Sequence, residues 1–339
     1  MWAFRAGAQN VTMEFMIRMS YLLGLAGVLL APALFAQTPT PTITKVDPAL
    51  DALLDPNATL EKVAGDLGFL EGPLWMQEGH LLFSDLFKNT VWKLVPGGKP
   101  EAYLTKAGWT SDEPPKVTHF GPNAMVLDKQ GRIVLCQQGN RQVVRVEKDK
   151  TLTLLFDKFE GKRLNGPNDI IKGKDGSIYF SDPPYGIARR TDSELGFCGI
   201  YRIKDGKLDL MIKEMGVPNG LAFSPDEKYL FVADGSAIKR FDVQKDGTFA
   251  NVSVFFDLAS LGRRGSPDGF RVDAKGNIFT SGARGIYVIS PEGKHLGTIN
   301  VPENPANCTF GGKDGHTLYI TAQTGLYAIQ TKTTGSAAK

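Results

Sequence analysis

Hydrophobic and polar positions alternate in short segments along most of the chain, and one plan of such segments returns six times. Each copy begins near a proline followed by a short polar residue, and continues with an apolar strand, a turn and a second alternating strand. The four clearest copies are 121–139, 166–184, 217–235 and 266–283, and two weaker copies are 71–87 and 304–323. Every copy therefore predicts a pair of antiparallel β-strands.

The spacing of the copies predicts the fold. Their prolines lie 38 to 51 residues apart, and each strand pair is followed by a third strand and, in the first five copies, by a fourth. Repeats of this length, built from short strands with Gly and Asp turns, are typical of propellers with four-stranded blades. We therefore predict an all-β chain that forms a six-bladed β-propeller over residues 58–332.

The two ends of the repeat array complement each other. The sixth copy stops after its third strand, whereas the segment 58–67 precedes the first copy and belongs to none. A free sheet edge would be open to pairing with other chains. We expect the N-terminal strand to become the outer strand of the last blade and so to close the ring.

The remaining segments are predicted to lie outside the propeller. Residues 1–36 contain Arg18, an apolar run and a small residue at the end, which is the pattern of a secretory signal peptide. A translation start at Met16 would shorten this segment, and an uncleaved anchor is the alternative interpretation. We interpret the proline-rich stretch 37–57 as a linker and 333–339 as a disordered tail. The protein is thus expected in the periplasm or outside the cell, with no stable membrane insertion after signal cleavage.

Composition narrows the classes of partner. Of 339 residues, 42% are hydrophobic, and 39 Lys and Arg against 36 Asp and Glu give a net charge of +3. Since no block of like charge stands out, neither nucleic acid nor a membrane surface is predicted as a partner. We interpret Cys136, Cys198 and Cys308 as buried free thiols, with a disulfide between the first two as the alternative. A monomer and a dimer are both compatible with the sequence.

Radial repetition places equivalent positions of the six copies on a circle around the propeller axis. The position after the repeat proline carries amide or carboxylate side chains in four copies: Asn123, Asn168, Asn219 and Asp268. The sixth copy has Asn307 one residue later, and the first copy has Glu71 two residues before its proline. Carboxylate and amide oxygens without His or Cys favour Ca²⁺, and they would hold Mg²⁺, Mn²⁺ or Zn²⁺ less selectively. The alternative is that Pro-Asn and Pro-Asp only initiate turns, which would not require the glutamate.

These segments resemble the gluconolactonase family, also called the SMP-30/gluconolactonase/LRE-like family. The resemblance rests on Glu71-Gly-Pro, on the run NGPND at 165–169 with DGSIYFSDPPYG after it, on Pro218-Asn-Gly and on Pro267-Asp-Gly. It covers essentially the whole chain after the signal segment. It implies a six-bladed propeller that binds one divalent cation and hydrolyses sugar lactones or other lactones.

The resemblance also implies roles for individual residues. The implied metal ligands are Glu71, Asn168, Asn219 and Asp268, and Asp268 is the implied general base. Arg163 and Asn165 match the family's substrate-contacting Arg and Asn, although the run RLNGPND is longer here than in the animal members. Three more substrate contacts are predicted from their places in the ring or its connections: Asn123, His119 and Tyr185. For His119 the alternative is a loop histidine without a role, and for Tyr185 a packing aromatic.

The expected function is metal-dependent hydrolysis of a small-molecule lactone. A cation would polarise the lactone carbonyl while Asp268 deprotonates water, so no serine nucleophile is needed. The chain has no Gly-x-Ser-x-Gly elbow, which argues against an esterase of the α/β-hydrolase type. Two alternatives remain open at this point. The same site could act on phosphotriesters or aryl esters, or the chain could be a non-catalytic propeller that binds a metal and a sugar.

Overall fold

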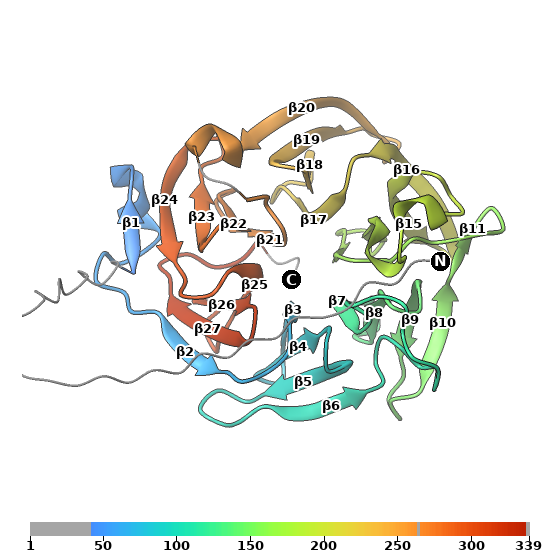
Figure 1. The fold of residues 1–339 in the computed structure, drawn as a ribbon. Coiled ribbons are helices and arrows are strands. Elements are labelled where there is room, and N and C mark those ends of the chain that lie inside the picture. The colour runs from blue at the N-terminus through green and yellow to red at the C-terminus, as the bar shows by residue number, and fades with distance from the viewer. Residues whose placement is uncertain (1–41, 263–264, 337–339) are drawn as a thin grey trace, which may run out of the picture. The chain divides into compact units, whose positions relative to one another are not determined.

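A computed structural model describes residues 42–262 and 265–336, in which six β-sheets surround a common axis (Figure 1). The predicted signal peptide, residues 1–36, lies outside the described residues. Neighbouring strands within each sheet are antiparallel, and the first strand of each blade contacts the first strands of the adjacent blades. This arrangement confirms the predicted six-bladed propeller.

The first three blades follow one another along the chain. Blade 1 contains β3 (Leu70–Met76), β4 (His80–Asp85), β5 (Thr90–Leu94) and β6 (Glu101–Thr105). Blade 2 contains β7 (Pro122–Leu127), β8 (Ile133–Gln137), β9 (Gln142–Val146) and β10 (Leu152–Phe156). Blade 3 contains β13 (Ile170–Lys172), β14 (Ile178–Asp182), β15 (Cys198–Lys204) and β16 (Lys207–Met215). A small ribbon of β11 (Lys158–Phe159) and β12 (Lys162–Arg163) separates blades 2 and 3.

The other three blades complete the ring. Blade 4 contains β17 (Pro218–Phe223), β18 (Tyr229–Asp234), β19 (Ala237–Val243) and β20 (Phe249–Asp257). Blade 5 contains β21 (Phe270–Val272), β22 (Ile278–Gly282), β23 (Gly285–Ile289) and β24 (His295–Asn300). Blade 6 contains β25 (Pro305–Gly311), β26 (Thr317–Ala322), β27 (Gly325–Gln330) and the N-terminal β2 (Glu61–Ala64). The pairing of β2 with β27 is the predicted closure of the ring by the N-terminal strand.

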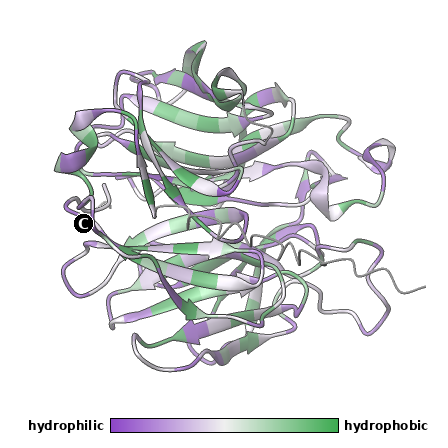
Figure 2. Cartoon of the chain, turned by 60° about the vertical axis from the view of Figure 1, so that its left-hand side comes forward, coloured by the Kyte–Doolittle hydropathy of each residue, from purple (hydrophilic) through white to green (hydrophobic). Residues whose placement is uncertain are grey.

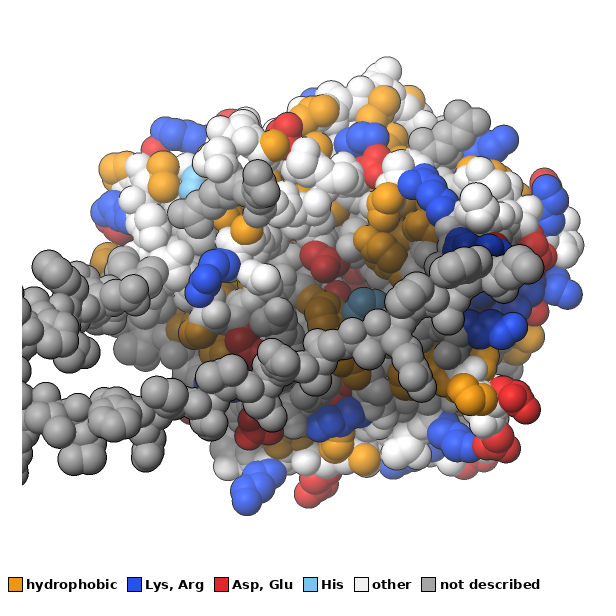
Figure 3. Space-filling model, viewed as in Figure 1, with side chains coloured by type: hydrophobic (Ala, Val, Ile, Leu, Met, Phe, Trp, Pro, Cys, Tyr) orange, Lys and Arg blue, Asp and Glu red, His pale blue; other side chains and the backbone are white. Residues whose placement is uncertain are grey.

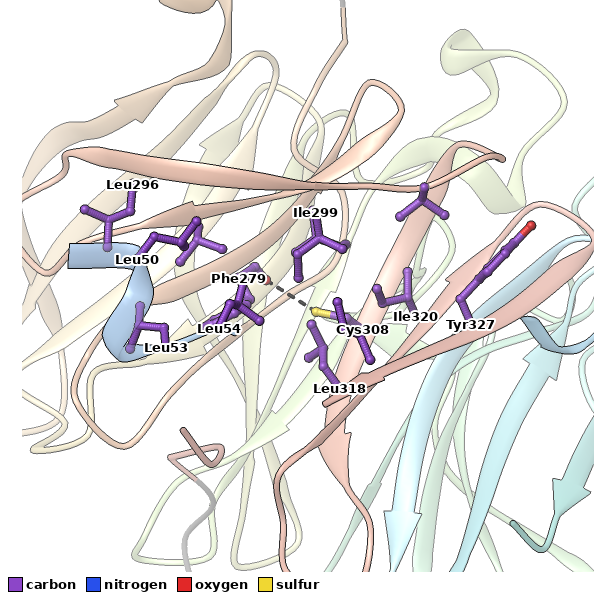
Figure 4. Close-up of a cluster of buried hydrophobic side chains, with 14 of the residues drawn as sticks. Leu50, Leu53, Leu54, Phe279, Leu296, Ile299, Cys308, Leu318, Ile320 and Tyr327 are labelled. Atoms are coloured by element: carbon purple, nitrogen blue, oxygen red, sulfur yellow. Dashed lines mark hydrogen bonds between the residues drawn. The ribbon is translucent and has the colours of Figure 1, made fainter. Parts of the chain in front are cut away.

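The linker prediction is wrong for residues 43–54. Strand β1 (Ile43–Lys45) pairs with β24 as a fifth strand of blade 5, and a 3₁₀ turn, η1 (Pro48–Ala52), follows it. Leu50, Leu53 and Leu54 are buried against blades 5 and 6 (Figure 4). Their spacing places all three on one side of the turn, so this segment buries apolar surface despite its prolines.

The prediction that residues 333–339 form a disordered tail is wrong for residues 333–336. Thr333 is buried and its hydroxyl donates to the carboxylate of Asp273 at 2.9 Å. Gly335 then forms a β-bridge with Asp273, and the N–H of Ser336 donates to the carbonyl of Val272. Residues 333–336 are therefore bound to blade 5, and 337–339 lie outside the described residues.

Hydrophobic side chains fill the spaces between blades. Each of six buried clusters combines residues from two neighbouring sheets, so every seam of the ring has its own core. Figure 2 shows the apolar positions concentrated in the strands and the polar ones in the connections. The three cysteines are buried free thiols, as predicted, and the Sγ of Cys308 lies 3.3 Å from the carbonyl oxygen of Phe279 (Figure 4).

Three further 3₁₀ turns lie in the connections, and they are η2 (Pro184–Gly186), η3 (Arg190–Asp192) and η4 (Leu258–Leu261). Across the described parts of the chain, no helix has the length and apolar character required to cross a bilayer.

Candidate active site

Main-chain hydrogen bonds between blades draw the starts of the inner strands together at the axis. The N–H of Ala124 donates to the carbonyl of Asn168 at 3.1 Å, and the N–H of Gly220 donates to the carbonyl of Asp268 at 3.1 Å. A Cβ atom on Gly220 would lie only 2.3 Å from that carbonyl oxygen. Glycine at this position therefore permits the close approach that brings the predicted ring residues of neighbouring blades together.

Serine hydroxyls of the second strands support these strand starts. The hydroxyl of Ser84 donates to the carbonyl of Asn123 at 2.6 Å, and the hydroxyl of Ser281 accepts from the N–H of Asp268 at 3.1 Å. Sequence reasoning missed this layer. A serine recurs as the next-to-last residue of the second strand in blades 1, 3 and 5, and this recurrence is the signal that could have found it.

Two carboxylates of the ring share the axis. Glu71 has only 4% of its surface exposed, and its Oε2 accepts from the N–H of Gly72 at 3.0 Å and from the side-chain amide of Asn307 at 3.2 Å. Burial raises the pKa of Glu71, and the charge of Asp169 raises it further. Burial also raises the pKa of Asp268 well above its usual range, with the charge of Glu71 as the next cause. The two carboxylates thus lie close enough to oppose each other's ionisation.

Asn219 connects Asp268 to Tyr185. Its side chain lies beside the Asp268 carboxylate and the Tyr185 hydroxyl, and against the larger effect of burial it lowers the pKa of both groups. Tyr185 is 38% exposed, and its pKa is raised to about 12 by burial first and by the charge of Asp268 second. The structure therefore places the predicted Tyr185 at the ring, on the side of Asn219 and Asp268.

Gln138 joins two other ring amides. Its Oε1 accepts from the amide group of Asn123 at 2.9 Å and from that of Asn168 at 3.4 Å, while its own amide group donates to the carbonyl of His119 at 2.8 Å. The N–H₂ groups of both asparagines are engaged in this way, which leaves their oxygens for a ligand on the axis. Gln138 does not belong to the repeat position, so the repeat pattern did not single it out.

His119 lies in an aromatic cluster beside Gln138. Its ring stacks on Phe87 with centroids 5.2 Å apart and meets Phe69 edge-on at 5.2 Å. Burial lowers the pKa of the His119 imidazole, which favours the neutral ring near pH 7. This predicted substrate contact therefore forms part of an apolar wall, together with the 43% exposed Phe87.

Asn165 and Arg163 form hydrogen bonds to the connections around blades 2 and 3. Asn165 is fully buried, and its amide donates to the carbonyl of Phe197 at 2.8 Å and accepts from Ser193 at 2.6 Å. The structure thus gives Asn165 a role in positioning the connection that contains Ser193 and Phe197. Arg163 donates to the carbonyl of Asn140 at 2.9 Å and lines a cavity beside the ring.

Buried aspartates at the ends of second strands fix the segments that enter three blades. Each accepts hydrogen bonds from two successive N–H groups of the segment that leads to the inner strand. The aspartates are Asp85, Asp182 and Asp234, and the N–H pairs are those of Gly68 and Phe69, Asn165 and Gly166, and Gly216 and Val217. These segments lead directly to Glu71, Asn168 and Asn219.

Replacing Asp85 by Ala is expected to destabilise the protein by about 3 to 5 kcal/mol, as measured by urea unfolding. Besides the N–H groups of Gly68 and Phe69, this fully buried carboxylate accepts hydrogen bonds from the N–H groups of Phe87 and Lys88 and from the indole of Trp92. The substitution leaves these donors without an acceptor. Asp226→Ala, in an exposed turn of blade 4, is the control and should cost less than about 1 kcal/mol. Equal losses in the free energy of unfolding for the two variants would contradict the role of Asp85 in fixing the segment before Glu71.

The axis is an acidic site with few neutralising groups. The charges that act most strongly on Asp268 are those of Glu71 and Asp169, and the guanidinium of Arg271 lies 3.6 Å from Asp169. Figure 3 shows acidic side chains near the centre of the ring, next to hydrophobic ones. Within residues 42–262 and 265–336, no three side chains of the His, Cys, Asp and Glu types gather in a metal-binding group. A cation on the axis would therefore be bound by two carboxylates together with amide oxygens.

Comparison with known proteins places this ring in a family. The sequence profile described as SMP-30/Gluconolactonase/LRE-like region matches residues 69–324, which extend from blade 1 to blade 6. The chain belongs to this family. Its resemblance to the family, stated above from the ring motifs, is thereby confirmed.

Individual relatives agree with the family match. A gluconolactonase from Zymomonas mobilis is 36% identical over 315 residues, which cover 86% of this chain and 87% of that protein. The solved structure of a gluconolactonase from Xanthomonas campestris superposes with a TM-score of 0.77 at 32% identity, covering 86% of this chain and 96% of that one. A calcium-binding protein, regucalcin, from Agrobacterium tumefaciens shares the fold at 18% identity, with a TM-score of 0.63 and coverage of 78% and 90%.

Proposed function

We propose that this protein is a lactone hydrolase of the gluconolactonase type whose ring of oxygen ligands holds one divalent cation. The observation that carries the proposal is the pair of mutually repelling carboxylates, Glu71 and Asp268, with the Asn219 amide beside one of them. The gluconolactonases that resemble this chain over most of its length support the choice of reaction.

The residues on the axis fit a hard cation. Burial and mutual repulsion make two ionised carboxylates costly at this position unless a positive charge lies between them. Glu71, Asn168, Asn219 and Asp268 would hold the cation through carboxylate and amide oxygens. Such a ligand set suits Ca²⁺ best and Mg²⁺, Mn²⁺ or Zn²⁺ less selectively.

When bound, the cation would supply Lewis-acid polarisation of the lactone carbonyl. Asp268 accepts a proton from the water that attacks the carbonyl carbon, and the neighbouring Asn219 amide favours the ionised carboxylate. The C–O bond of the lactone ring then breaks, and the proton passes from Asp268 to the departing ring oxygen. The product is the open hydroxy acid, with the atoms of one water added.

Hydrolysis of aryl esters is a second candidate for the same site. The aromatic cluster of Phe69, Phe87 and His119 favours it, because Phe87 is partly exposed and could contact an aryl group. Phosphotriesters would be substrates for the same reason as esters, because a cation on the axis would polarise the P=O bond as it would a C=O bond. The remaining alternative is a propeller that binds a metal and a sugar without catalysis.

Acid release from D-glucono-δ-lactone, above the spontaneous rate, tests the proposal. We expect turnover to disappear after EDTA treatment and to return on addition of Ca²⁺ or another of the four cations. Phenyl acetate and a phosphotriester, assayed in parallel, should react more slowly than the lactone. If no lactone is turned over with any cation while calorimetry still detects cation binding, the non-catalytic alternative replaces the hydrolase.

We further propose that the protein is exported. The basic and apolar pattern of residues 1–36 supports this, and N-terminal sequencing of the protein from a cell-envelope fraction would test it. A mature N-terminus near residue 37 is the expected result, and a chain that keeps residues 16–36 would contradict cleavage.

A further inference from the structure

A cavity of about 520 Å³ lies beside the ring, among the connections of blades 1, 2 and 3. Basic and polar side chains form much of its lining, and those that matter here are Trp109, Lys116, Asn140, Arg141 and Arg163. A volume of this size accommodates a small sugar derivative. The catalytic steps described above use none of these side chains.

Two chain segments form a wall shared by this cavity and the ring. Gln138 bonds to the ring amides, and the next residue, Gly139, lines the cavity. Tyr185 lies beside Asn219 at the ring, and the next residue, Gly186, lines the cavity. A Cβ atom on Gly186 would lie 2.4 Å from the Gln138 carbonyl oxygen, so these two segments are in direct contact. One residue of each segment thus separates the cavity from the proposed reaction centre.

Arg141 lines this cavity, and its guanidinium has one unused hydrogen-bond donor. Its side chain is only 12% exposed, and its Nε donates to the carbonyl of Leu164 at 2.6 Å. Its Nη2 is buried and has no hydrogen-bond acceptor among the described residues, and the nearest carboxylate oxygen, of Glu194, is 3.9 Å away. Buried guanidinium N–H groups are rarely left without an acceptor, so a ligand atom is the natural partner.

A second guanidinium strengthens the positive charge. Arg163 lines the cavity, and its charge, after burial, contributes to a lowered pKa of Arg141, so the two side chains repel each other. Lys116 adds a third cation at the exposed edge.

Three acidic side chains lie nearby. Asp192 is bound by Arg189 at 2.9 Å, Glu194 accepts from the backbone N–H of Arg163 at 3.0 Å, and the buried Asp182 accepts from the N–H groups of Asn165 and Gly166. Because Arg189 already compensates one of the three acids, the three cations of the cavity face two remaining carboxylates, and the excess charge is positive.

We propose that this cavity binds an anionic substituent of the lactone substrate, a carboxylate or a phosphate, through Arg141 and Arg163. The proposal rests on the proposed lactone hydrolysis and narrows its substrates to lactones of acidic sugars. A guanidinium donates paired hydrogen bonds to the oxygens of either anion, and the cavity shares a wall with the ring where the ester would react.

Kinetics on two matched substrates test the proposal in the full chain. We expect 6-phospho-D-glucono-δ-lactone to be hydrolysed with a higher kcat/KM than D-glucono-δ-lactone. Arg141→Gln should lower the ratio of the two values by roughly 10- to 100-fold, since charge-assisted hydrogen bonds are lost. Arg145→Gln is the matched control, because Arg145 pairs with Glu147 away from the cavity, and it should leave the ratio unchanged. An unchanged ratio in Arg141→Gln, in a variant that melts like the wild type, would overturn the proposal.

Binding without turnover separates this proposal from the proposed reaction. In calorimetry after EDTA treatment, 6-phosphogluconate should bind more tightly than gluconate, and Arg141→Gln should remove the difference. If this result holds but no lactone is hydrolysed, the anion site stands and the hydrolase proposal fails. Binding of inorganic phosphate without any preference for the phosphorylated lactone would overturn the assignment to the substrate.

Discussion

Asp268→Asn is expected to reduce kcat/KM for lactone hydrolysis about 10³-fold. The substitution keeps an oxygen at the ring and the contact to Asn219, but it removes the group that accepts the proton from water. General bases contribute about 10²- to 10⁴-fold to such reactions, and the lost charge would also weaken the hold on a cation. The measurement is the initial rate of acid release at saturating Ca²⁺, corrected for spontaneous opening of the lactone.

Asp246→Asn is the control for this prediction. Asp246 is an exposed carboxylate in a turn of blade 4, where it accepts from Thr248. It undergoes the same chemical change far from the axis and should retain the full rate. If Asp268→Asn also retains more than about a tenth of the rate at saturating Ca²⁺, Asp268 is not the base.

Calcium is expected to raise the thermal midpoint of the protein by about 4 °C at a concentration 100 times its dissociation constant. A cation that binds the folded ring and not the unfolded chain stabilises the fold by about 2.7 kcal/mol at this concentration. Glu71→Gln should remove most of the shift, because it deletes one of the two carboxylates on the axis. Differential scanning fluorimetry after EDTA treatment, with Ca²⁺, Mg²⁺, Mn²⁺ and Zn²⁺ added separately, is the measurement.

Glu61→Gln controls for nonspecific effects of charge. Glu61 is an exposed residue of the outer strand β2, and its variant should show the full calcium shift. An equal shift in Glu71→Gln, or the absence of any shift with all four cations in the wild type, would contradict a cation site that includes Glu71.

Because of the repeat, most of the fold could be predicted from the sequence. Six copies of one strand pattern predict six blades, and the missing strand of the last copy predicts closure by the N-terminal segment, which β2 provides. The repeat also predicted which polar residues meet, because equivalent positions of a propeller necessarily surround its axis. Besides burial, Glu71 and Asn219 both act on the pKa of Asp268 at the axis.

The structures of segments outside the repeat could not be predicted in this way. Residues 43–54 looked like a linker because of their prolines, and their three leucines find a core only when blades 5 and 6 are adjacent. Asn165 and Arg163 follow a motif of the family, but β12 and the connection after it direct one into the interior and the other to the side cavity.

The sequence by itself determined the number of blades, the order of strands, the closure and the oxygen-rich ring, because each of these follows from a local pattern repeated at a fixed period. The tertiary structure alone decided that Gln138 links two ring amides, that Asp85 secures the segment before Glu71, and that Arg141 keeps a buried donor unused. The physical reason is that a hydrogen bond between non-equivalent connections depends on where two irregular backbones meet, and no periodicity in the chain encodes that meeting point.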